Sequence, residues 1–247
     1  MRRPLPQPFL SLVIPAHNEA SRLPATLEQA FAFLDAQPYE SEVMVVENGS
    51  RDDTLAIARS FQASRSTLQV LRIAQSGKGR AVKAGMLAAR GEYRFFADAD
   101  FSMPISEVNR FIPPALPNMD IAIASREAPG AVRYDEPAYR HMVGRVFNMF
   151  VRVMALPGLQ DSQCGFKCFR GGVVEEVFPH QTLPGWSFDV ELLFIARRRG
   201  YRIVEIPIPW YFNPDSKVKV GRDSVQMGLD LLTIRWNALQ GRYNGKV

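Results

Sequence analysis

The chain has 247 residues, of which 47% are hydrophobic and 22% charged, and these proportions exclude a disordered or fibrous protein. Its length suits one large α/β domain over residues 1–247 better than two ordinary domains. The net charge of +5 and the pI near 9.4 suit an anionic partner such as a nucleotide, a phospholipid surface or a nucleic acid, and equally a soluble protein with a mildly basic surface.

The two cysteines, Cys164 and Cys168, complete neither a zinc site nor a secreted disulfide framework. The basic start of the chain leads into a strand-like run rather than into the apolar segment and cleavage site of a signal peptide. The most apolar stretch, 146–156, is interrupted by Asn148 and Arg152 and is shorter than the roughly 20 residues of a membrane span. We therefore expect a cytoplasmic protein without a transmembrane segment that can touch the inner face of the membrane.

Short apolar runs alternate with helical patterns in the first half of the chain, which predicts a mostly parallel sheet flanked by helices. The first unit is a strand at 9–14 followed by a helix at 21–36. Asn48-Gly49-Ser50 favours a turn, and Ser50 is the expected N-cap of the next helix. The other elements predicted here are strands at 43–46, 68–73, 93–97 and 120–124 and a helix at 80–89.

The second half has a looser pattern. It predicts helices at 139–154, 188–198 and 220–236 and strands at 165–169 and 201–206. In the last helix, one face carries Val225, Leu229, Leu232 and Trp236. This face suits either the core or a membrane surface, and we expect it to pack against the core.

Two carboxylates, in Asp98-Ala99-Asp100, directly follow the strand at 93–97. Ligands of open α/β sheets gather at the carboxyl ends of the strands, so these side chains are well placed to act on a bound molecule. Mg²⁺ and Mn²⁺ prefer such hard oxygen ligands and complete their shell with water and phosphate oxygens. A solvated turn is the alternative, because Asp-x-Asp is short and common.

A glycine-rich basic segment, Ser76-Gly77-Lys78-Gly79-Arg80, stands at the start of the helix at 80–89. Glycines allow the backbone to approach a phosphate closely, and a helix N-terminus beside lysine and arginine favours anions. The segment lacks the glycine spacing of a Walker A loop, so a simple basic turn is the alternative to a phosphate-binding loop.

The first two predicted strands are also followed by polar loops, Pro15-Ala16-His17-Asn18-Glu19 and Glu47-Asn48-Gly49-Ser50. Parallel strands bring both loops to the same edge of the sheet as the two aspartates. Together these segments resemble the nucleotide-binding half of glycosyltransferase family 2, which has a GT-A fold. In that family the first loop and the acidic residue after the second strand hold the base and ribose, and Asp-x-Asp holds the metal and diphosphate.

The resemblance extends over about residues 8–236 and is strongest to the dolichyl-phosphate β-glucosyltransferase group and its prokaryotic polyprenyl-phosphate relatives. The later matching segments are 78–82, 97–100, 125–126, 161–167, 186–191 and 226–231. The resemblance implies a nucleotide-sugar-binding half over about 8–125 and an acceptor-binding half over about 126–247. Its implied nucleotide-sugar residues are Pro15, Asn18, Glu19, Glu47, Asn48, Gly49, Ser50, Lys78, Arg80 and Asp98, and its implied ligands of Mg²⁺ or Mn²⁺ are Asp98 and Asp100.

The implied reaction is an inverting transfer of a sugar from a nucleoside diphosphate to polyprenyl or dolichyl phosphate. UDP-glucose is the expected donor and GDP-mannose the alternative, since Glu47 stands where the family commonly has aspartate. Asp98 and Asp100 with the metal, and Lys78 or Arg80, are the candidates that neutralise the leaving diphosphate.

The two kinds of acceptor need different catalytic groups. A lipid phosphate is largely ionised at neutral pH, because its second pKa is about 6, so it needs cations rather than a general base. Arg126 is the candidate for this role and Lys217 a second, with surface charge as the alternative for both. A hydroxyl acceptor would need a carboxylate, for which Asp189 and Glu191 are candidates; stabilisation of the start of their helix is the alternative.

Two other classes of protein compete with this interpretation. A nucleotidyltransferase would have a glycine-rich basic signature directly after the first strand, where this chain has Pro15-Ala16-His17-Asn18-Glu19. A nucleic-acid-binding module would suit the pI, but the sequence has no zinc finger, RNP-like run or concentrated basic helix. The expected partners are a nucleotide sugar, a lipid phosphate and, transiently, a membrane surface, without nucleic acid.

Overall fold

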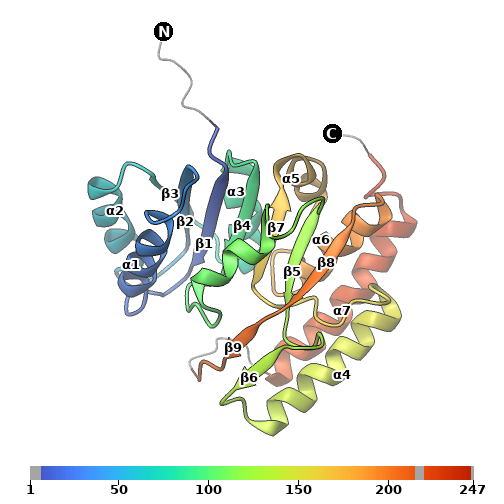
Figure 1. Ribbon diagram of the computed structural model, residues 1–247. Helices are drawn as coiled ribbons and strands as arrows, with labels where there is room; N and C mark the ends of the chain where they lie inside the picture. Colours follow the sequence, from blue (N-terminus) through green and yellow to red (C-terminus); the bar gives the residue numbers. More distant parts are fainter. Residues whose placement is uncertain (1–6, 215–219, 246–247) are drawn as a thin grey trace.

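Seven strands form the central sheet of the computed structural model, in the order β3-β2-β1-β4-β7-β5-β8 (Figure 1). The structure describes the backbone of residues 7–214 and 220–245 and the side chains of 7–214 and 225–245. The strands are β1 (Leu10–Ala16), β2 (Ser41–Asn48), β3 (Leu68–Ile73), β4 (Tyr93–Ala97), β5 (Ile121–Ser125), β7 (Phe166–Arg170) and β8 (Ile203–Pro207). Since β7 alone runs antiparallel to its neighbours in this sheet, the predicted mostly parallel sheet of an α/β domain is confirmed.

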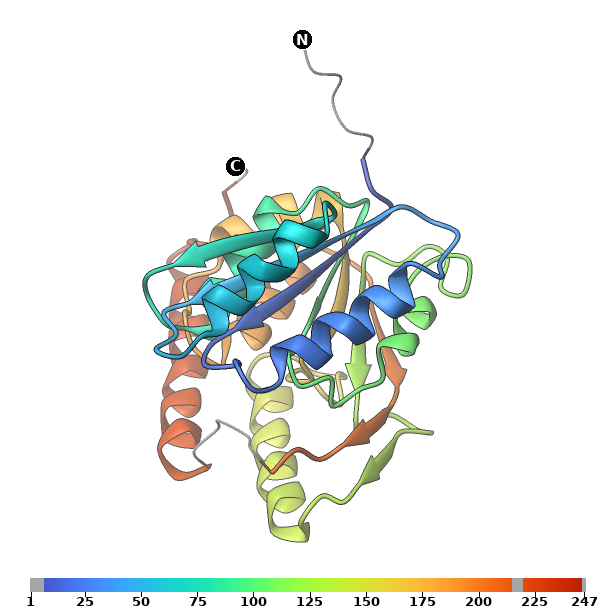
Figure 2. The ribbon, with the colours of Figure 1, turned by 90° about the vertical axis from the view of Figure 1, so that its left-hand side faces the viewer.

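Helices cover both faces of the sheet and give three layers (Figure 2). On one face lie α1 (Leu23–Leu34), α2 (Thr54–Ser64) and the 3-10 helix η1 (Ile105–Phe111). On the other face lie α3 (Lys78–Ala88), α5 (Gly171–Val177), the 3-10 helix η2 (Phe178–His180) and α6 (Phe188–Arg198). The strands β1, β2, β4 and β5 are buried almost throughout, which is why they are continuous apolar runs in the sequence.

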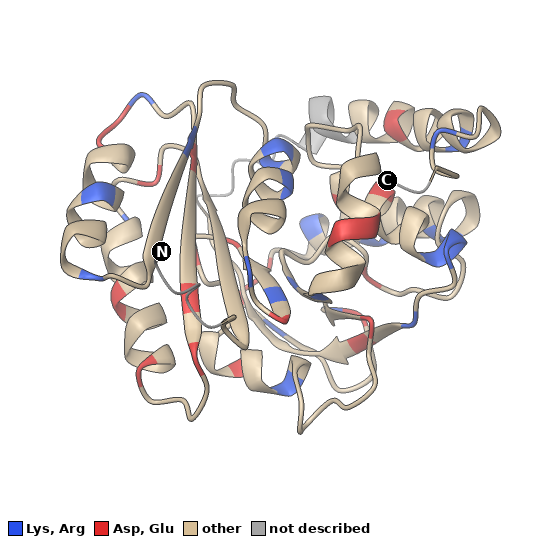
Figure 3. Cartoon of the chain, turned by 90° about the horizontal axis from the view of Figure 1, so that it is seen from above, with Lys and Arg blue, Asp and Glu red and all other residues tan. Residues whose placement is uncertain are grey.

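The second half of the chain adds elements beyond the sheet. A short parallel pair is formed by β6 (Val132–Tyr134) and β9 (Pro209–Tyr211). Next to it, α4 (Ala138–Met154) packs beside α7 (Val220–Leu239) (Figure 1). Basic and acidic residues are interspersed on both sides of the sheet (Figure 3). Among the described helices, none combines the length and the apolar character that crossing a bilayer requires.

Several predicted elements have the expected bounds, but two local predictions are wrong. The strands at 68–73 and 93–97 and the helix at 188–198 are found as predicted. Ser50 is not an N-cap, because α2 begins only at Thr54. Instead, Ser50 Oγ accepts a hydrogen bond from Asn18 N at 3.0 Å and so joins the loops after β1 and β2.

The second wrong prediction concerns the buried face of α7. The residues expected in the core, Val225, Leu229, Leu232 and Trp236, are 53–67% exposed. The helix buries another stripe, which consists of Met227, Asp230, Leu231, Ile234 and Asn237. Helix α7 therefore has two apolar faces, and the one expected in the core faces outward.

Candidate active site

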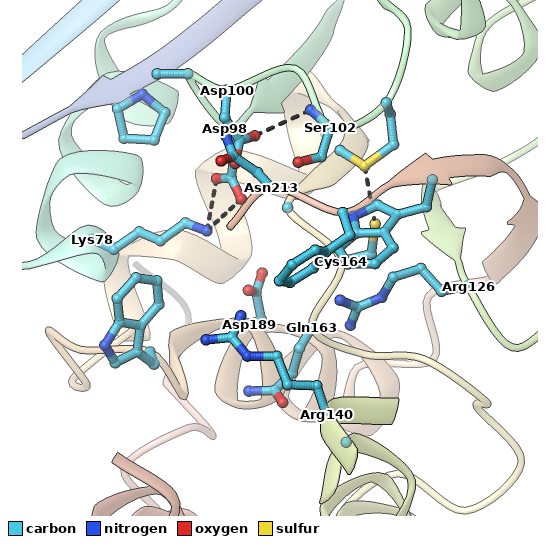
Figure 4. A pocket seen from close by; sticks show the side chains of 18 of the residues that line it. Lys78, Asp98, Asp100, Ser102, Arg126, Arg140, Gln163, Cys164, Asp189 and Asn213 are labelled. Carbon is cyan, nitrogen blue, oxygen red and sulfur yellow. Dashed lines mark hydrogen bonds and ion pairs between the residues drawn. The ribbon is translucent and has the colours of Figure 1, made fainter. Parts of the chain in front are cut away.

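A cavity of about 560 Å³ opens at the carboxyl ends of β1, β2 and β4, between the sheet and α4 (Figure 4). The predicted site residues on its wall are Pro15, Glu19, Asn48, Lys78, Asp98, Asp100, Arg126 and Asp189. The predicted residues that do not line it are Asn18, Glu47, Gly49, Ser50, Arg80 and Glu191, and Lys217 lies outside the described residues. One cavity thus contains carboxylates, an ammonium group and a guanidinium group.

The two aspartates and Lys78 form a charged cluster at the carboxyl end of β4. Lys78, the first residue of α3, places Nζ 2.6 Å from Asp98 Oδ1 and 2.8 Å from Asp98 Oδ2. Burial and the charge of Asp98 raise the pKa of Asp100. Burial opposes the charge of Lys78, but the Asp98 and Asp189 carboxylates raise the pKa of Lys78 above its usual range. Negative charge is therefore crowded around one ammonium group, an arrangement that a second cation would relieve.

The donor set of this cluster fits a divalent ion that shares its ligands with a substrate. No group of three or more His, Cys, Asp or Glu side chains is placed to hold a metal among the residues the structure describes. Mg²⁺ needs only one or two carboxylates, because water and phosphate oxygens complete its shell. Asp98 and Asp100 offer two such hard oxygen donors on one wall of the cavity, so they fit an ion that arrives with a diphosphate.

Gly165 leaves the space that the Asp98 carboxylate occupies. The loop before β7 passes so close to β4 that Asp98 N donates a hydrogen bond to Gly165 O at 3.0 Å. A Cβ on Gly165 would lie 2.0 Å from Asp98 Oδ2 and 2.3 Å from its carboxyl carbon. Any larger residue at this position must therefore displace the carboxylate that pairs with Lys78.

Gly165→Ala should lower the rate of catalysis by about ten- to a hundredfold, because a displacement of about 1 Å in a catalytic group can have that effect. Gly185→Ala is the matched control, since Gly185 lines the same cavity and an added Cβ there meets nothing within 4 Å. Steady-state rates and thermal melting of both variants test this expectation. Equal rates for the two variants would contradict it.

The loops after β1 and β2 are tied together by hydrogen bonds. Glu47 is 2% exposed, and its Oε1 accepts a hydrogen bond from Ser50 N at 2.5 Å. In the orientation of the Asn48 side-chain amide that satisfies both of its neighbours, the amide nitrogen donates a hydrogen bond to Ala16 O at 2.8 Å. The amide oxygen then accepts a hydrogen bond from Gly77 N at 3.1 Å. Glu47 and Ser50 therefore shape the turn, whereas Asn48 itself reaches the cavity and links it to the start of α3.

Arg126, directly after β5, is held by a buried carboxylate. Its Nε and Nη2 lie 2.6 and 3.0 Å from the two Asp161 oxygens, and its backbone N donates to Asp161 Oδ2 at 3.0 Å. Asp161 is fully buried; burial raises its pKa, but the charge and hydrogen bonds of Arg126 lower it to about 2. The guanidinium also lies 5.5 Å from the centre of the Trp210 ring. Arg126 thus presents a fixed positive charge to the cavity.

Three further arginines of the cavity wall, Arg22, Arg133 and Arg140, were not predicted from the sequence. Arg133 forms ion pairs with Glu127 and Glu136, while the guanidinium of Arg140 lies 5.2 Å from the centre of the Phe212 ring. Figure 4 shows Arg126 and Arg140 reaching into the cavity across from Lys78 and Asp98. The signal that could have identified Arg140 is its helical spacing with four other lining residues of α4, Val143, Gly144, Phe147 and Asn148.

Asp189 lines the cavity and is paired with the buried Lys167. Its Oδ1 accepts a hydrogen bond from Lys167 Nζ at 2.8 Å, and both side chains are nearly inaccessible. Burial raises the pKa of Asp189, against the charges of Lys167 and Lys78. Lys167 belongs to the matching segment 161–167, but its role in fixing Asp189 was not predicted from the sequence.

Glu191 has a different environment, although it is two residues further along α6. Its carboxylate is fully buried and accepts hydrogen bonds from Thr182 N and Oγ1, Leu183 N and Tyr243 Oη at 2.6–2.9 Å. These four bonds fasten the loop before α6 and the end of the chain that follows α7. The geometry therefore favours a structural role for Glu191 rather than the predicted catalytic one.

Comparison with known proteins identifies similar sequences over most of the chain. A family model described as glycosyl transferase family 2 matches residues 11–178. The chain is 34% identical over 259 residues to a dolichyl-phosphate beta-glucosyltransferase of Saccharomyces cerevisiae, covering 95% of this chain and 76% of that protein. It is 31% identical over 253 residues to the Homo sapiens protein of the same name, covering 96% of this chain and 78% of that protein.

Solved structures with a similar fold include complexes of a glucosyl-3-phosphoglycerate synthase. Glucosyl-3-phosphoglycerate synthase from Mycobacterium tuberculosis in complex with UDP has a TM-score of 0.67 at 18% identity, over 92% of this chain and 80% of that one. The same enzyme with Mn²⁺, UDP and phosphoglyceric acid has a TM-score of 0.66 at 16% identity, over 96% of this chain and 78% of that one. At these identities the likeness establishes the fold alone.

Proposed function

The chain belongs to glycosyl transferase family 2, and we propose that it transfers a sugar, with inversion, from a nucleoside diphosphate to polyprenyl or dolichyl phosphate. The family match and the structural likeness confirm the predicted resemblance and the GT-A fold. The observation that carries the proposal is that one cavity holds the Lys78–Asp98 pair with Asp100 on one side and the Arg126 guanidinium on another (Figure 4).

The side of the cavity formed by β1, β2 and β4 is the proposed donor site. Asp98 and Asp100 would hold Mg²⁺ or Mn²⁺, which when bound neutralises charge on the leaving diphosphate. Lys78 supplies a second positive charge beside the same oxygens, while Asn48 and the loop after β1 face the nucleoside. Mn²⁺ and UDP in the similar synthase support this assignment, and the names of the relatives support glucose as the sugar.

Inversion follows from a single displacement. An acceptor phosphate oxygen attacks the anomeric carbon opposite the diphosphate; the new C–O bond forms as the bond to the diphosphate oxygen breaks. An α-linked donor then yields a β-linked sugar phosphate, and no proton has to be removed from an ionised acceptor. Arg126 holds the acceptor phosphate in line, because Asp161 fixes the direction in which its guanidinium points.

A hydroxyl acceptor is the second candidate, and Asp189 is the observation in its favour. A carboxylate in the cavity could take the proton of a hydroxyl group, a contribution of about 10² to 10⁴ in rate. The buried partner Lys167 instead favours a fixed charge at Asp189 that orients the sugar. The nucleotidyltransferase alternative is disfavoured because the model that matches residues 11–178, which include the strands of the proposed donor site, describes glycosyl transferases.

A transfer assay with a panel of nucleotide sugars tests the proposal. The protein is incubated with each donor and Mn²⁺ or Mg²⁺, with and without polyprenyl phosphate, and products are identified by mass spectrometry and by NMR of the anomeric proton. We expect a β-linked sugar phosphodiester only in the presence of polyprenyl phosphate. An α-linked product, or transfer to free hydroxyl groups alone, would overturn the proposed acceptor chemistry.

UDP should bind at least about tenfold more tightly than GDP, because a site with hydrogen-bonding groups for one base leaves them unpaired with another. Isothermal titration of both nucleotides in the presence of Mn²⁺ measures this difference. Tight GDP binding without UDP binding would make GDP-mannose the donor and leave the proposed acceptor unaffected.

A further inference from the structure

The outer faces of α4 and α7 expose an unusual number of large apolar side chains. On α4 they are Tyr139, Met142, Val143, Val146, Met149, Phe150 and Val153, which are 38–80% exposed. On α7 they are Val225, Leu229, Leu232, Trp236 and Leu239, which are 53–81% exposed. Each set recurs every three or four residues and therefore forms one stripe along its helix. We call these two sets together the apolar surface.

The two stripes belong to neighbouring helices, since α4 and α7 are in contact (Figure 1). Soluble monomers rarely leave contiguous apolar patches of this kind, and such patches mark sites of association. The composition is also unusual for a solvated face, because Tyr139 and Trp236 are the amphipathic aromatic residues that concentrate at membrane–water interfaces.

The charges around the apolar surface indicate whether a lipid bilayer or a second copy of the chain covers it. Helix α4 contains no acidic residue and, besides Arg140 of the cavity wall, carries the exposed Arg145 and Arg152. In the described side chains of α7, the acidic residue is Asp230, which is 8% exposed and accepts a hydrogen bond from Gln226. Two copies of so basic a surface would repel each other, whereas the headgroups of an anionic bilayer would attract it.

The apolar surface is continuous with the acceptor side of the cavity. Val143 belongs both to the apolar surface and to the cavity wall, to which α4 also contributes Arg140, Gly144, Phe147 and Asn148 and α7 contributes Met227. One pair of helices therefore faces the surroundings on one side and the cavity on the other. A phosphate that lies near Arg126 and Arg140 would have its hydrocarbon chain leave along these helices.

We infer that the apolar surface seats the protein on an anionic bilayer, with α4 and α7 lying in the plane of the headgroups. That a lipid phosphate then enters the cavity from this bilayer rests on the proposed function. Amphipathic helices with arginines beside an apolar stripe bind in this way without crossing the membrane. The acceptor can then keep its chain in the bilayer while its phosphate enters the cavity.

Vesicle co-sedimentation tests the surface without any substrate. The full chain is mixed with vesicles of phosphatidylcholine alone or of equal parts phosphatidylcholine and phosphatidylglycerol. We expect binding to the anionic vesicles, and a loss of binding of about tenfold or more for the variant V146E/V153E/L232E, in which charged groups replace three apolar contacts. Leu87→Glu is the matched control, since Leu87 is an exposed apolar residue of α3 outside the surface.

Circular dichroism and thermal melting establish that each variant is folded, and light scattering measures the oligomeric state. Absence of wild-type binding to anionic vesicles would overturn the inference, as would equal binding by the triple variant and the wild type. A wild-type dimer that the triple variant abolishes would assign the surface to a second copy instead. Vesicle binding without sugar transfer would refute the proposed function alone, because the binding assay contains neither donor nor acceptor.

Discussion

Asp100→Asn should reduce transfer by about 10² to 10³, the range found when one electrostatic contributor to a transition state is removed. The substitution keeps the shape of the side chain and removes the charge that we propose holds the metal beside the diphosphate. The protein should remain folded, because Asp100 is crowded by the Asp98 carboxylate and loses repulsion when it becomes neutral. Rates with Mn²⁺, calorimetry of UDP with and without Mn²⁺, and thermal melting measure the three effects.

The control for this variant is Asp53→Asn, an exposed carboxylate that does not line the cavity. We expect it to transfer sugar at the wild-type rate. Asp100→Asn should still bind UDP weakly, but Mn²⁺ should no longer strengthen that binding. A variant that retains both the Mn²⁺ effect and the rate would remove Asp100 from the metal site.

Metal removal gives an independent expectation for the same site. EDTA should abolish transfer, and Mn²⁺ or Mg²⁺ should restore it, because Lys78 alone leaves most of the diphosphate charge uncompensated. The measurement is the initial rate after dialysis against chelator and again after metal addition. Full activity in a thoroughly metal-free sample would show that Lys78 and the arginines suffice.

The strands and the acidic motif were predictable because their signals are local. The strands at 68–73 and 93–97 are apolar runs between turn residues, and Asp98-Ala99-Asp100 stands at the end of one of them. The position of these two aspartates at the edge of the sheet depends on this order alone, since parallel strands bring their carboxyl ends together whatever surrounds them. The family resemblance added residue roles that no local pattern contains.

The direction in which helices face was not predictable in the same way. Helix α7 has two apolar stripes, and only packing into the core on one side of the sheet decides which of them is buried. Arg140 was missed for a related reason, because its role depends on which side of α4 faces the sheet. Asp189 and Glu191 are close in sequence, yet one enters the cavity and the other is enclosed, because successive positions on a helix point in different directions.

We expect two separate effects of replacing Arg126, one on the free energy of unfolding and one on sugar transfer to the acceptor. Arg126→Ala leaves Asp161 as a fully buried charge without its partner, which typically costs about 3–5 kcal/mol in the free energy of unfolding. The double variant R126A/D161N removes the stranded charge as well. We expect the double variant to regain much of the lost stability in thermal melting and to remain defective in transfer.

The transfer defect of R126A/D161N should exceed its defect in UDP binding by about a hundredfold, because the proposed function assigns Arg126 to the acceptor and not to the nucleotide. Arg126 and Asp161 keep their charges from pH 5 to 8, since the pKa of Asp161 is lowered to about 2 and that of Arg126 is raised. The wild-type rate should therefore fall only below about pH 6, where the acceptor phosphate gains a proton. If the double variant transferred sugar to polyprenyl phosphate at the wild-type rate, Arg126 would have no role in holding the acceptor, and the fixed guanidinium would serve only to secure the loop after β5.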